Sequence, residues 1–217
     1  MMTRKRFDQQ LEELHLQLIK MGALCEQAIA QANRSLLEGD HSLAKATIAL
    51  DQEIDEKERE IESLCLQLLL RQQPVAGDLR QISAALKMIT DMERIGDQAA
   101  DIAEISLLMD KAREGSVRSR YVREMARATG KMVTASIDAY VRQDLALADE
   151  VIRADDEVDD LFTRVKEELI AFIHQDVNYG EAAVNLLMIA KYFERIGDHA
   201  TNIAEWAAFA VKGRETS

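Results

Sequence analysis

A chain of 217 residues, 47% hydrophobic and 30% charged, is long enough for one large domain or two small ones with a buried core. The net charge of −12 argues against nucleic-acid binding, because most of the surface would repel a phosphate backbone. The sequence contains no apolar run long enough to span a membrane and no secretory signal pattern, so we expect a cytoplasmic protein that meets membranes only through partners.

The first half of the sequence predicts three long helices. Proline occurs once and glycine nine times, and strong helix formers dominate, which favours an all-α fold. Apolar residues every three or four positions predict the first helix, which Gly39 ends. Asp40 is a suitable N-cap for the second helix, and Pro74 suits the start of the third. We place these helices at about residues 7–38, 40–72 and 75–111.

The second half repeats the first. After a linker around Gly115, helices are expected to end near Arg142, His174 and Val211. The segment "DQEIDE" from Asp51 matches "DDEVDD" from Asp155, an offset of 155 − 51 = 104 residues. We therefore predict two tandem three-helix bundles related by an internal repeat, at residues 1–113 and 114–217. A single six-helix array is the alternative that periodicity leaves open.

Two cysteines, Cys25 and Cys65, lie in apolar stripes and have no metal-ligand or redox spacing. We expect both to be buried free thiols.

One acidic string occurs twice. "ERIGDQAADIAE" begins at Glu93 and "ERIGDHATNIAE" at Glu194, an offset of 194 − 93 = 101, and nine of the twelve positions agree. Successive α-helical residues turn by about 100°, so Glu93, Asp97 and Asp101 share one face of the third helix. Like charges at this spacing disfavour a helix by a few tenths of a kcal/mol per pair, and a mid-helix Gly96 by roughly 1 kcal/mol more.

Bound cations would explain this arrangement, because they turn repelling carboxylates into shared ligands. The second helix carries a matching acidic face that could meet the first if the two helices pack side by side. We predict metal ligands at Asp51, Asp55, Glu93, Asp97 and Asp101 in the first half, and at Asp155, Asp159, Glu194, Asp198 and Asn202 in the second. Asn202 stands where the first half has an aspartate, so the first site should bind metal at least as well. His199 is a secondary candidate, and ordinary solvated acidic faces are the alternative.

The doubled Glu-Arg-Ile-Gly-Asp, within the segments 74–104 and 188–205, resembles the PhoU family of phosphate-transport regulators. The resemblance implies two three-helix bundles that bind multinuclear clusters of iron, zinc, manganese or magnesium at these acidic motifs. It also implies a cytoplasmic, commonly dimeric regulator without enzymatic activity. Such a protein would restrain phosphate uptake through a phosphate ABC transporter and help a phosphate-responsive sensor histidine kinase to repress the starvation response.

Three other functions compete with this interpretation. A di-iron or metal-storage protein requires paired Glu-x-x-His motifs, of which Glu12 and His15 provide only one. A phosphotransfer domain would need a histidine such as His41, which sits at a turn where an exposed or capping role is commoner. A purely structural helical spacer would bind no metal. Asp78 and Arg80 have no counterpart in the second half, and we expect them to form a local hydrogen-bonded turn.

Overall fold

The structure is a computed structural model that describes residues 2–72, 75–109 and 119–213. It confirms the all-α fold, because the described residues form six long helices and no strand. The helices are α1 (Met2–Glu38), α2 (His41–Gln72), α3 (Ala76–Leu108), α5 (Arg120–Arg142), α6 (Leu145–Gln175) and α7 (Gly180–Lys212), with a 3₁₀ turn η1 (Val177–Tyr179) before α7.

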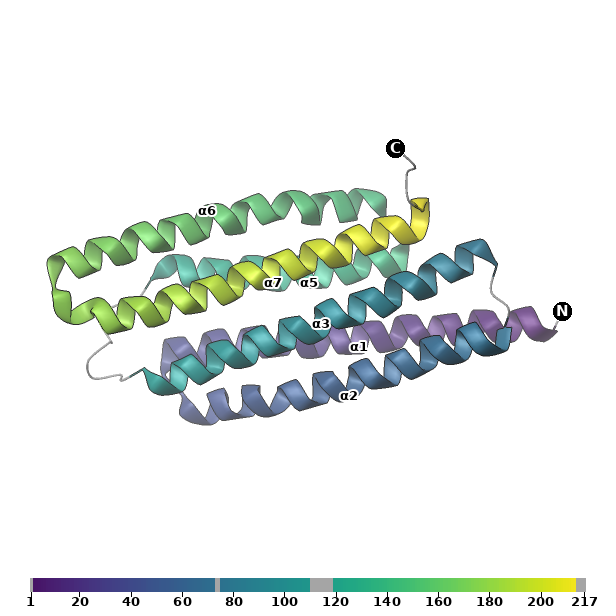
Figure 1. The fold of residues 1–217 in the computed structure, drawn as a ribbon, viewed down its shortest axis with the longest axis horizontal. Coiled ribbons are helices and arrows are strands. Elements are labelled where there is room, and N and C mark those ends of the chain that lie inside the picture. Colours follow the sequence, from purple (N-terminus) through teal and green to yellow (C-terminus); the bar gives the residue numbers. More distant parts are fainter. Residues whose placement is uncertain (1, 73–74, 110–118, 214–217) are drawn as a thin grey trace.

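The helices form two layers that run along the long axis of the molecule (Figure 1). In one layer α2, α3, α7 and α6 lie side by side in that order, and α1 and α5 lie behind α3 and α7. The three-helix unit is thus present in each half, as the repeat predicts. The units pack against one another through α3 with α7 and α1 with α5, and one apolar core runs through both.

The repeat extends to the turns that join the helices. Gly39 and Gln143 are 143 − 39 = 104 residues apart, and both have a left-handed φ of 55°. The next residue caps the following helix in each half. Oδ1 of Asp40 accepts backbone N–H groups at 2.9 and 3.1 Å, and Oδ1 of Asp144 accepts them at 3.0 and 3.1 Å. The second half therefore keeps the turn geometry without the glycine.

Most other helix ends agree closely with expectation, but α1 begins at Met2 instead of at about residue 7. The third helix ends at Leu108 instead of the expected 111, and residues 110 and 111 lie outside the described part. Pro74, the linker at Gly115 and the expected boundary between residues 113 and 114 also lie outside it. Asp78 makes the predicted local contact, accepting the backbone N–H of Val75 at 3.3 Å.

Both cysteines are buried free thiols, as predicted. Burial is the main cause that raises the pKa of Cys25 and of Cys65 to about 12, so neither is a ready thiolate at neutral pH. Across the described residues, no helix combines the length and apolar character needed to cross a membrane.

Candidate metal centres

The acidic face of α2 meets that of α3 at one close contact. A Cβ atom on Gly96 would lie 2.8 Å from Oδ1 of Asp51 and 2.9 Å from Cδ1 of Ile54. Only glycine leaves this space open without displacing a neighbour. The mid-helix glycine, which disfavours the helix by roughly 1 kcal/mol relative to alanine, thus allows an aspartate of α2 to reach the backbone of α3.

The same contact recurs in the second half. A Cβ atom on Gly197 would lie 3.0 Å from Oδ1 of Asp155 and 3.4 Å from Cγ1 of Val158. Asp155 and Gly197 are the repeat equivalents of Asp51 and Gly96 in the sequence. Each half therefore contains an aspartate seated on a glycine of the neighbouring helix.

Five carboxylates gather around the contact in the first half, and we call them the first carboxylate cluster: Asp51, Asp55, Glu93, Asp97 and Asp101. The pKa of Asp51 is raised to about 6, chiefly by burial and then by the charges of Asp97, Asp55 and Asp101. Burial also raises the pKa of Glu93, with Asp97 as the next cause. The structure thus brings together the side chains that the sequence places on separate helices.

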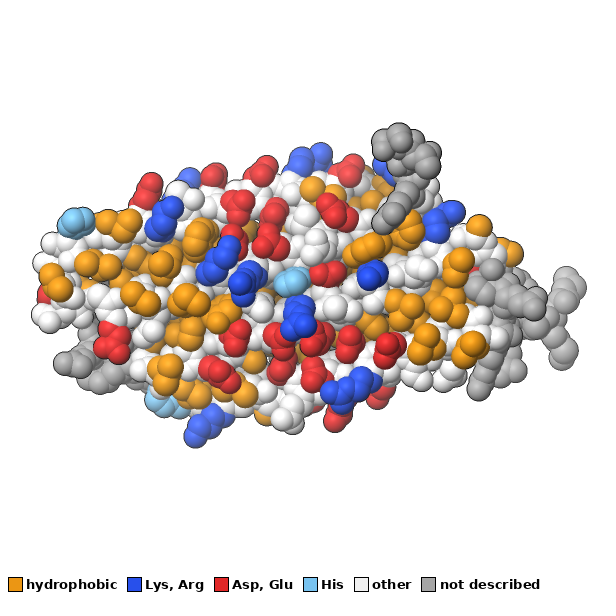
Figure 2. All heavy atoms as spheres, in the orientation of Figure 1, with side chains coloured by type: hydrophobic (Ala, Val, Ile, Leu, Met, Phe, Trp, Pro, Cys, Tyr) orange, Lys and Arg blue, Asp and Glu red, His pale blue; other side chains and the backbone are white. Residues whose placement is uncertain are grey.

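Four carboxylates form the second carboxylate cluster: Asp155, Asp159, Glu194 and Asp198. The pKa of Asp155 is raised to about 6 by burial first, and then by Asp198, Asp159 and Glu194. Burial followed by the charge of Glu194 raises the pKa of Asp198 as well. Figure 2 shows acidic side chains gathered near the middle of the four-helix layer, over α2 and α3 and over α6 and α7.

One carboxylate oxygen of the first cluster is unsatisfied. Oδ1 of Asp51 is buried and has no hydrogen-bond partner. A buried acceptor without a partner destabilises the fold by about 1–3 kcal/mol, and more when it is charged. The site therefore has both the oxygen chemistry and the unfilled acceptor that a hard or borderline cation would use.

Basic side chains stand beside both clusters. Nη1 of Arg94 lies 2.8 Å from Oδ2 of Asp97, and its Nε lies 3.4 Å from Oε2 of Glu93. In the second half, Lys191 pairs with Glu194. Within the described ranges, no three His, Cys, Asp or Glu side chains are arranged as a group that could hold an ion in these conformations.

Asn202 makes its contact between the two halves. Its Nδ2 donates to Oδ1 of Asp91 in α3 at 3.1 Å, and Nδ1 of His199 lies 2.9 Å from the same oxygen. Asp101 makes the reciprocal approach to Tyr192 of α7, whose side chain partly offsets the rise that burial causes in the pKa of Asp101. Asp101 and Asn202 are thus equivalent residues that reach across the α3–α7 interface.

Sequence reasoning missed the contributions of Asp91 and Tyr192. The signal that could have found them is the repeat itself, because 192 − 91 and 202 − 101 both equal 101. An antiparallel packing of α3 on α7 about a two-fold relation places residue 91 beside 202 whenever it places 101 beside 192. The packing of these two helices was not deducible from periodicity.

The histidines proposed for other chemistry lie apart from the clusters. The ring of His15 packs edge-on against that of Tyr140, with 5.6 Å between the ring centroids, and burial lowers the pKa of His15. The neighbouring Glu12 is exposed. His41 is exposed at the start of α2, as expected of a residue at a turn.

A family model described as "PhoU domain" matches the sequence twice, at residues 18–106 and 122–207. A "Phosphate-specific transport system accessory protein PhoU homolog" of Clostridium acetobutylicum is 36% identical over 215 residues, which is 99% of this chain and 98% of the relative. A protein of the same description from Caulobacter vibrioides is 35% identical over 213 residues, covering 98% and 93% of the two chains.

Solved structures show the same fold. The crystal structure of PhoU from Pseudomonas aeruginosa superposes with a TM-score of 0.88 at 34% identity, over 96% of this chain and all of that one (100%). The phosphate transport system regulatory protein PhoU from Streptococcus pneumoniae gives a TM-score of 0.87 at 24% identity, over 96% and 98% of the two chains, and supports the fold alone. With both halves matched and relatives aligned along nearly its whole length, this chain belongs to the PhoU family.

Proposed function

We propose that this protein is an accessory regulator of a phosphate transport system. The observation that carries the proposal is the full-length similarity to proteins named for that role, at 36% and 35% identity. The fold suits such a function, because long helices present broad surfaces to partner proteins. A regulator of this kind acts by binding one state of its partner more tightly than another, and no catalysis by the chain is required.

The regulation we propose is negative. When phosphate is plentiful, the protein restrains uptake by binding a subunit of a phosphate ABC transporter, and it holds a phosphate-responsive sensor histidine kinase in its repressing state. It acts in the cytoplasm as a homodimer and reaches the membrane only through these partners. The acidic composition, with a net charge of −12, suits protein partners better than nucleic acid.

We further propose that metal ions bind at the two carboxylate clusters, with iron, zinc, manganese and magnesium as the candidates. The buried, unsatisfied Oδ1 of Asp51 supports this proposal, as do burial and, after it, the repulsion between carboxylates, which together raise the pKa of Asp51 and Asp155. Bound cations would neutralise this repulsion and satisfy the buried oxygen. Asp101 and Asn202, already engaged at the α3–α7 interface, would link metal occupancy to the packing of the two halves.

Residues in and beside the first carboxylate cluster would have distinct roles in metal binding. Gly96 keeps the backbone of α3 free of side-chain bulk, and Asp51 fills the space that it leaves. Asp97 supplies a carboxylate from α3, which Arg94 holds by an ion pair. Arg94 would have to release Asp97 for that oxygen to act as a ligand, so the arginine competes with metal.

Deletion of the gene tests the regulatory proposal. A reporter of phosphate-starvation genes should become active in high phosphate, and a copy of the gene should restore repression. Repression that persists without the gene contradicts the proposal.

A further inference from the structure

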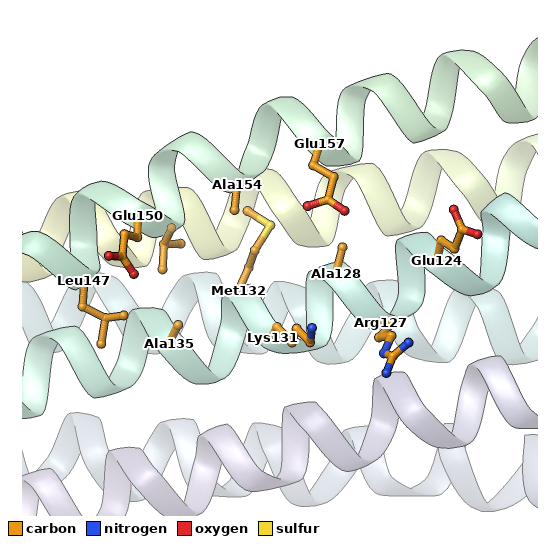
Figure 3. A pocket seen from close by; sticks show the side chains of 11 residues that line it. Glu124, Arg127, Ala128, Lys131, Met132, Ala135, Leu147, Glu150, Ala154 and Glu157 are labelled. Carbon is orange, nitrogen blue, oxygen red and sulfur yellow. The ribbon is translucent and has the colours of Figure 1, made fainter.

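A groove of about 470 Å³ runs between α5 and α6 on the surface (Figure 3). Its floor is made of small or flexible apolar side chains: Ala128, Met132, Ala135, Leu147, Val151 and Ala154. Met132 extends from α5 toward Ala154 of α6 (Figure 3). Methionine in such a floor adapts to the shape of an apolar ligand, because its side chain is unbranched and flexible.

The two halves of the repeat differ at the floor of the groove. The offset of 104 that relates Gly39 to Gln143 places Leu24 at the position of Ala128 and Leu50 at that of Ala154. Leu50 is buried and Leu24 packs against the core, so the first half carries larger apolar side chains at these two positions. The second half has alanine at both positions. At these two positions the second half therefore has less side-chain volume between α5 and α6 than the first half has in the equivalent place.

The rims of the groove carry opposite charges. Arg127 and Lys131 stand one turn apart on α5, and Glu150 and Glu157 stand two turns apart on α6, all four exposed. None of the four forms an ion pair or a side-chain hydrogen bond with another residue in the described part of the chain. Glu124 adds a carboxylate at one end of the α5 rim.

The basic rim also borders a second hollow. Arg127 and Lys131 line a depression of about 840 Å³ between α1 and α5, where Arg123 joins them. Arg123, Arg127 and Lys131 recur every four residues, so they form a basic ridge along α5. In a chain of net charge −12 an unpaired basic ridge is a local attractor for acidic side chains.

We propose that the α5–α6 groove binds an amphipathic α-helix of a partner protein. The helix sets an apolar stripe on the floor, acidic side chains against Arg127 and Lys131, and basic side chains against Glu150 and Glu157. The complementary charges argue for this occupant, since a uniformly acidic or basic segment would meet repulsion at one rim. The inference deepens the proposed regulatory function and rests on it, by assigning a surface through which a partner is held.

A synthetic helix of known chemistry tests the proposal on the full-length protein. The probe is a peptide of about 15 residues, four helical turns, with a Leu/Met stripe, glutamates on one flank and lysines on the other. A control peptide has the same composition and stripe but mixes both charges on each flank. Fluorescence anisotropy should show binding at least about tenfold tighter for the segregated peptide. Equal affinities would overturn the proposal.

Filling the groove provides the second arm. Ala154→Leu restores the side chain that the first half carries at Leu50, and it should weaken segregated-peptide binding at least about tenfold while helicity and melting temperature are kept. Ala49→Leu is the matched control, because Ala49 is exposed on α2. Undiminished binding by Ala154→Leu would overturn the proposal. A second outcome would also overturn the proposal: the unmodified protein is a dimer that binds no peptide, and Ala154→Leu converts it to a monomer. A second copy of the chain would then be the occupant of the groove.

Exchanging the charges provides the third arm. Arg127→Glu with Lys131→Glu should weaken binding of the segregated peptide, and adding Glu150→Lys with Glu157→Lys should restore it. Restoration is expected because the helix can bind in the reverse direction, which exchanges its flanks. A failure to restore would overturn the assignment of the rims.

Two further controls separate the possible failures. Lys45→Glu with Lys87→Glu makes the same change in net charge on exposed residues of α2 and α3, and it should leave binding unchanged. If gene deletion activates the phosphate-starvation genes in high phosphate but the peptide does not bind, the assignment of the groove as a helix-binding site is wrong. The proposed regulatory function would still stand in that case.

Discussion

Oδ1 of Asp51 in α2 lies 2.8 Å from the position that a Cβ atom of residue 96 in α3 would occupy, and that residue is glycine. The second half repeats the relationship between Asp155 and Gly197 at 3.0 Å. In each half, the glycine therefore lets two neighbouring helices bring carboxylates from their facing sides close together. The doubled acidic string is a packing motif as well as a set of charges.

Replacing this glycine should disturb both the packing and the cluster. Gly96→Ala introduces a methyl group that meets Asp51 and the buried Ile54, and such overpacking destabilises by about 1–3 kcal/mol. The higher helix propensity of alanine offsets up to about 1 kcal/mol. We expect a net loss of about 1 kcal/mol in the free energy of unfolding, measured with urea. Gly77→Ala is the control, because nothing lies within 4 Å of a Cβ there; a Gly96→Ala protein as stable as this control would contradict the expectation.

The metal-free protein should become more stable as the pH falls from 7 toward 5. The folded-state pKa of Asp51 and of Asp155 is raised to about 6 from an ordinary value of 3.8. A raised pKa means that the folded state binds protons more tightly than the unfolded state, so protonation of these two aspartates stabilises the fold. This stabilisation is fully present below about pH 3.8 and is lost as the pH rises through 6. Chemical denaturation in the presence of a chelator measures this slope. Asp51→Asn, which mimics the protonated carboxyl, should make it shallower, and an unchanged slope would show that Asp51 does not contribute.

Neutralising two ligands should empty one cluster and preserve the fold. Asp97→Asn with Asp101→Asn removes two of the carboxylates that face Asp51, so elemental analysis of the metal-loaded protein should find only the metal of the second cluster. Asp149→Asn with Asp160→Asn makes the same charge change on exposed residues of α6 and should leave the metal content unchanged. Equal metal content in both variants would argue against the first cluster.

The contact between the two halves should contribute measurably to stability. Asp91→Ala removes the acceptor for both His199 and Asn202, and we expect a loss of about 1 kcal/mol in the free energy of unfolding. Asp91→Asn keeps an acceptor oxygen at the same place and should lose less. Urea denaturation of the two variants compares them directly, and identical losses would mean that the hydrogen bonds are not the cause.

The helices and the acidic faces could be predicted because both follow from residues close in sequence. Gly39 and Asp40 mark a helix boundary by their own backbone and capping preferences, and the period of the helix places Asp97 beside Glu93. Contacts between helices have no such local signal. The sequence therefore showed that Gly96 weakens a helix but could not show that Asp51 fills the space beside it.

Other features depended on helix packing for the same reason. The packing of α1 against α5 places the ring of His15 against Tyr140, a contact that the sequence of α1 alone does not show. Asn202 was assigned to the second cluster, and the packing of α7 on α3 brings it to Asp91. The α5–α6 groove is lined in part by Ala128 and Ala154, and nothing in the sequence near these alanines shows that α5 and α6 leave a hollow there.

Anomalous diffraction from crystals of the protein loaded with iron, zinc or manganese tests the two proposed metal sites most directly. We expect strong peaks within about 2.0–2.6 Å of carboxylate oxygens in the first carboxylate cluster, and we expect them to be at least as strong as those in the second cluster. The absence of a peak at both clusters in crystals of the fully loaded protein would contradict the proposed metal sites.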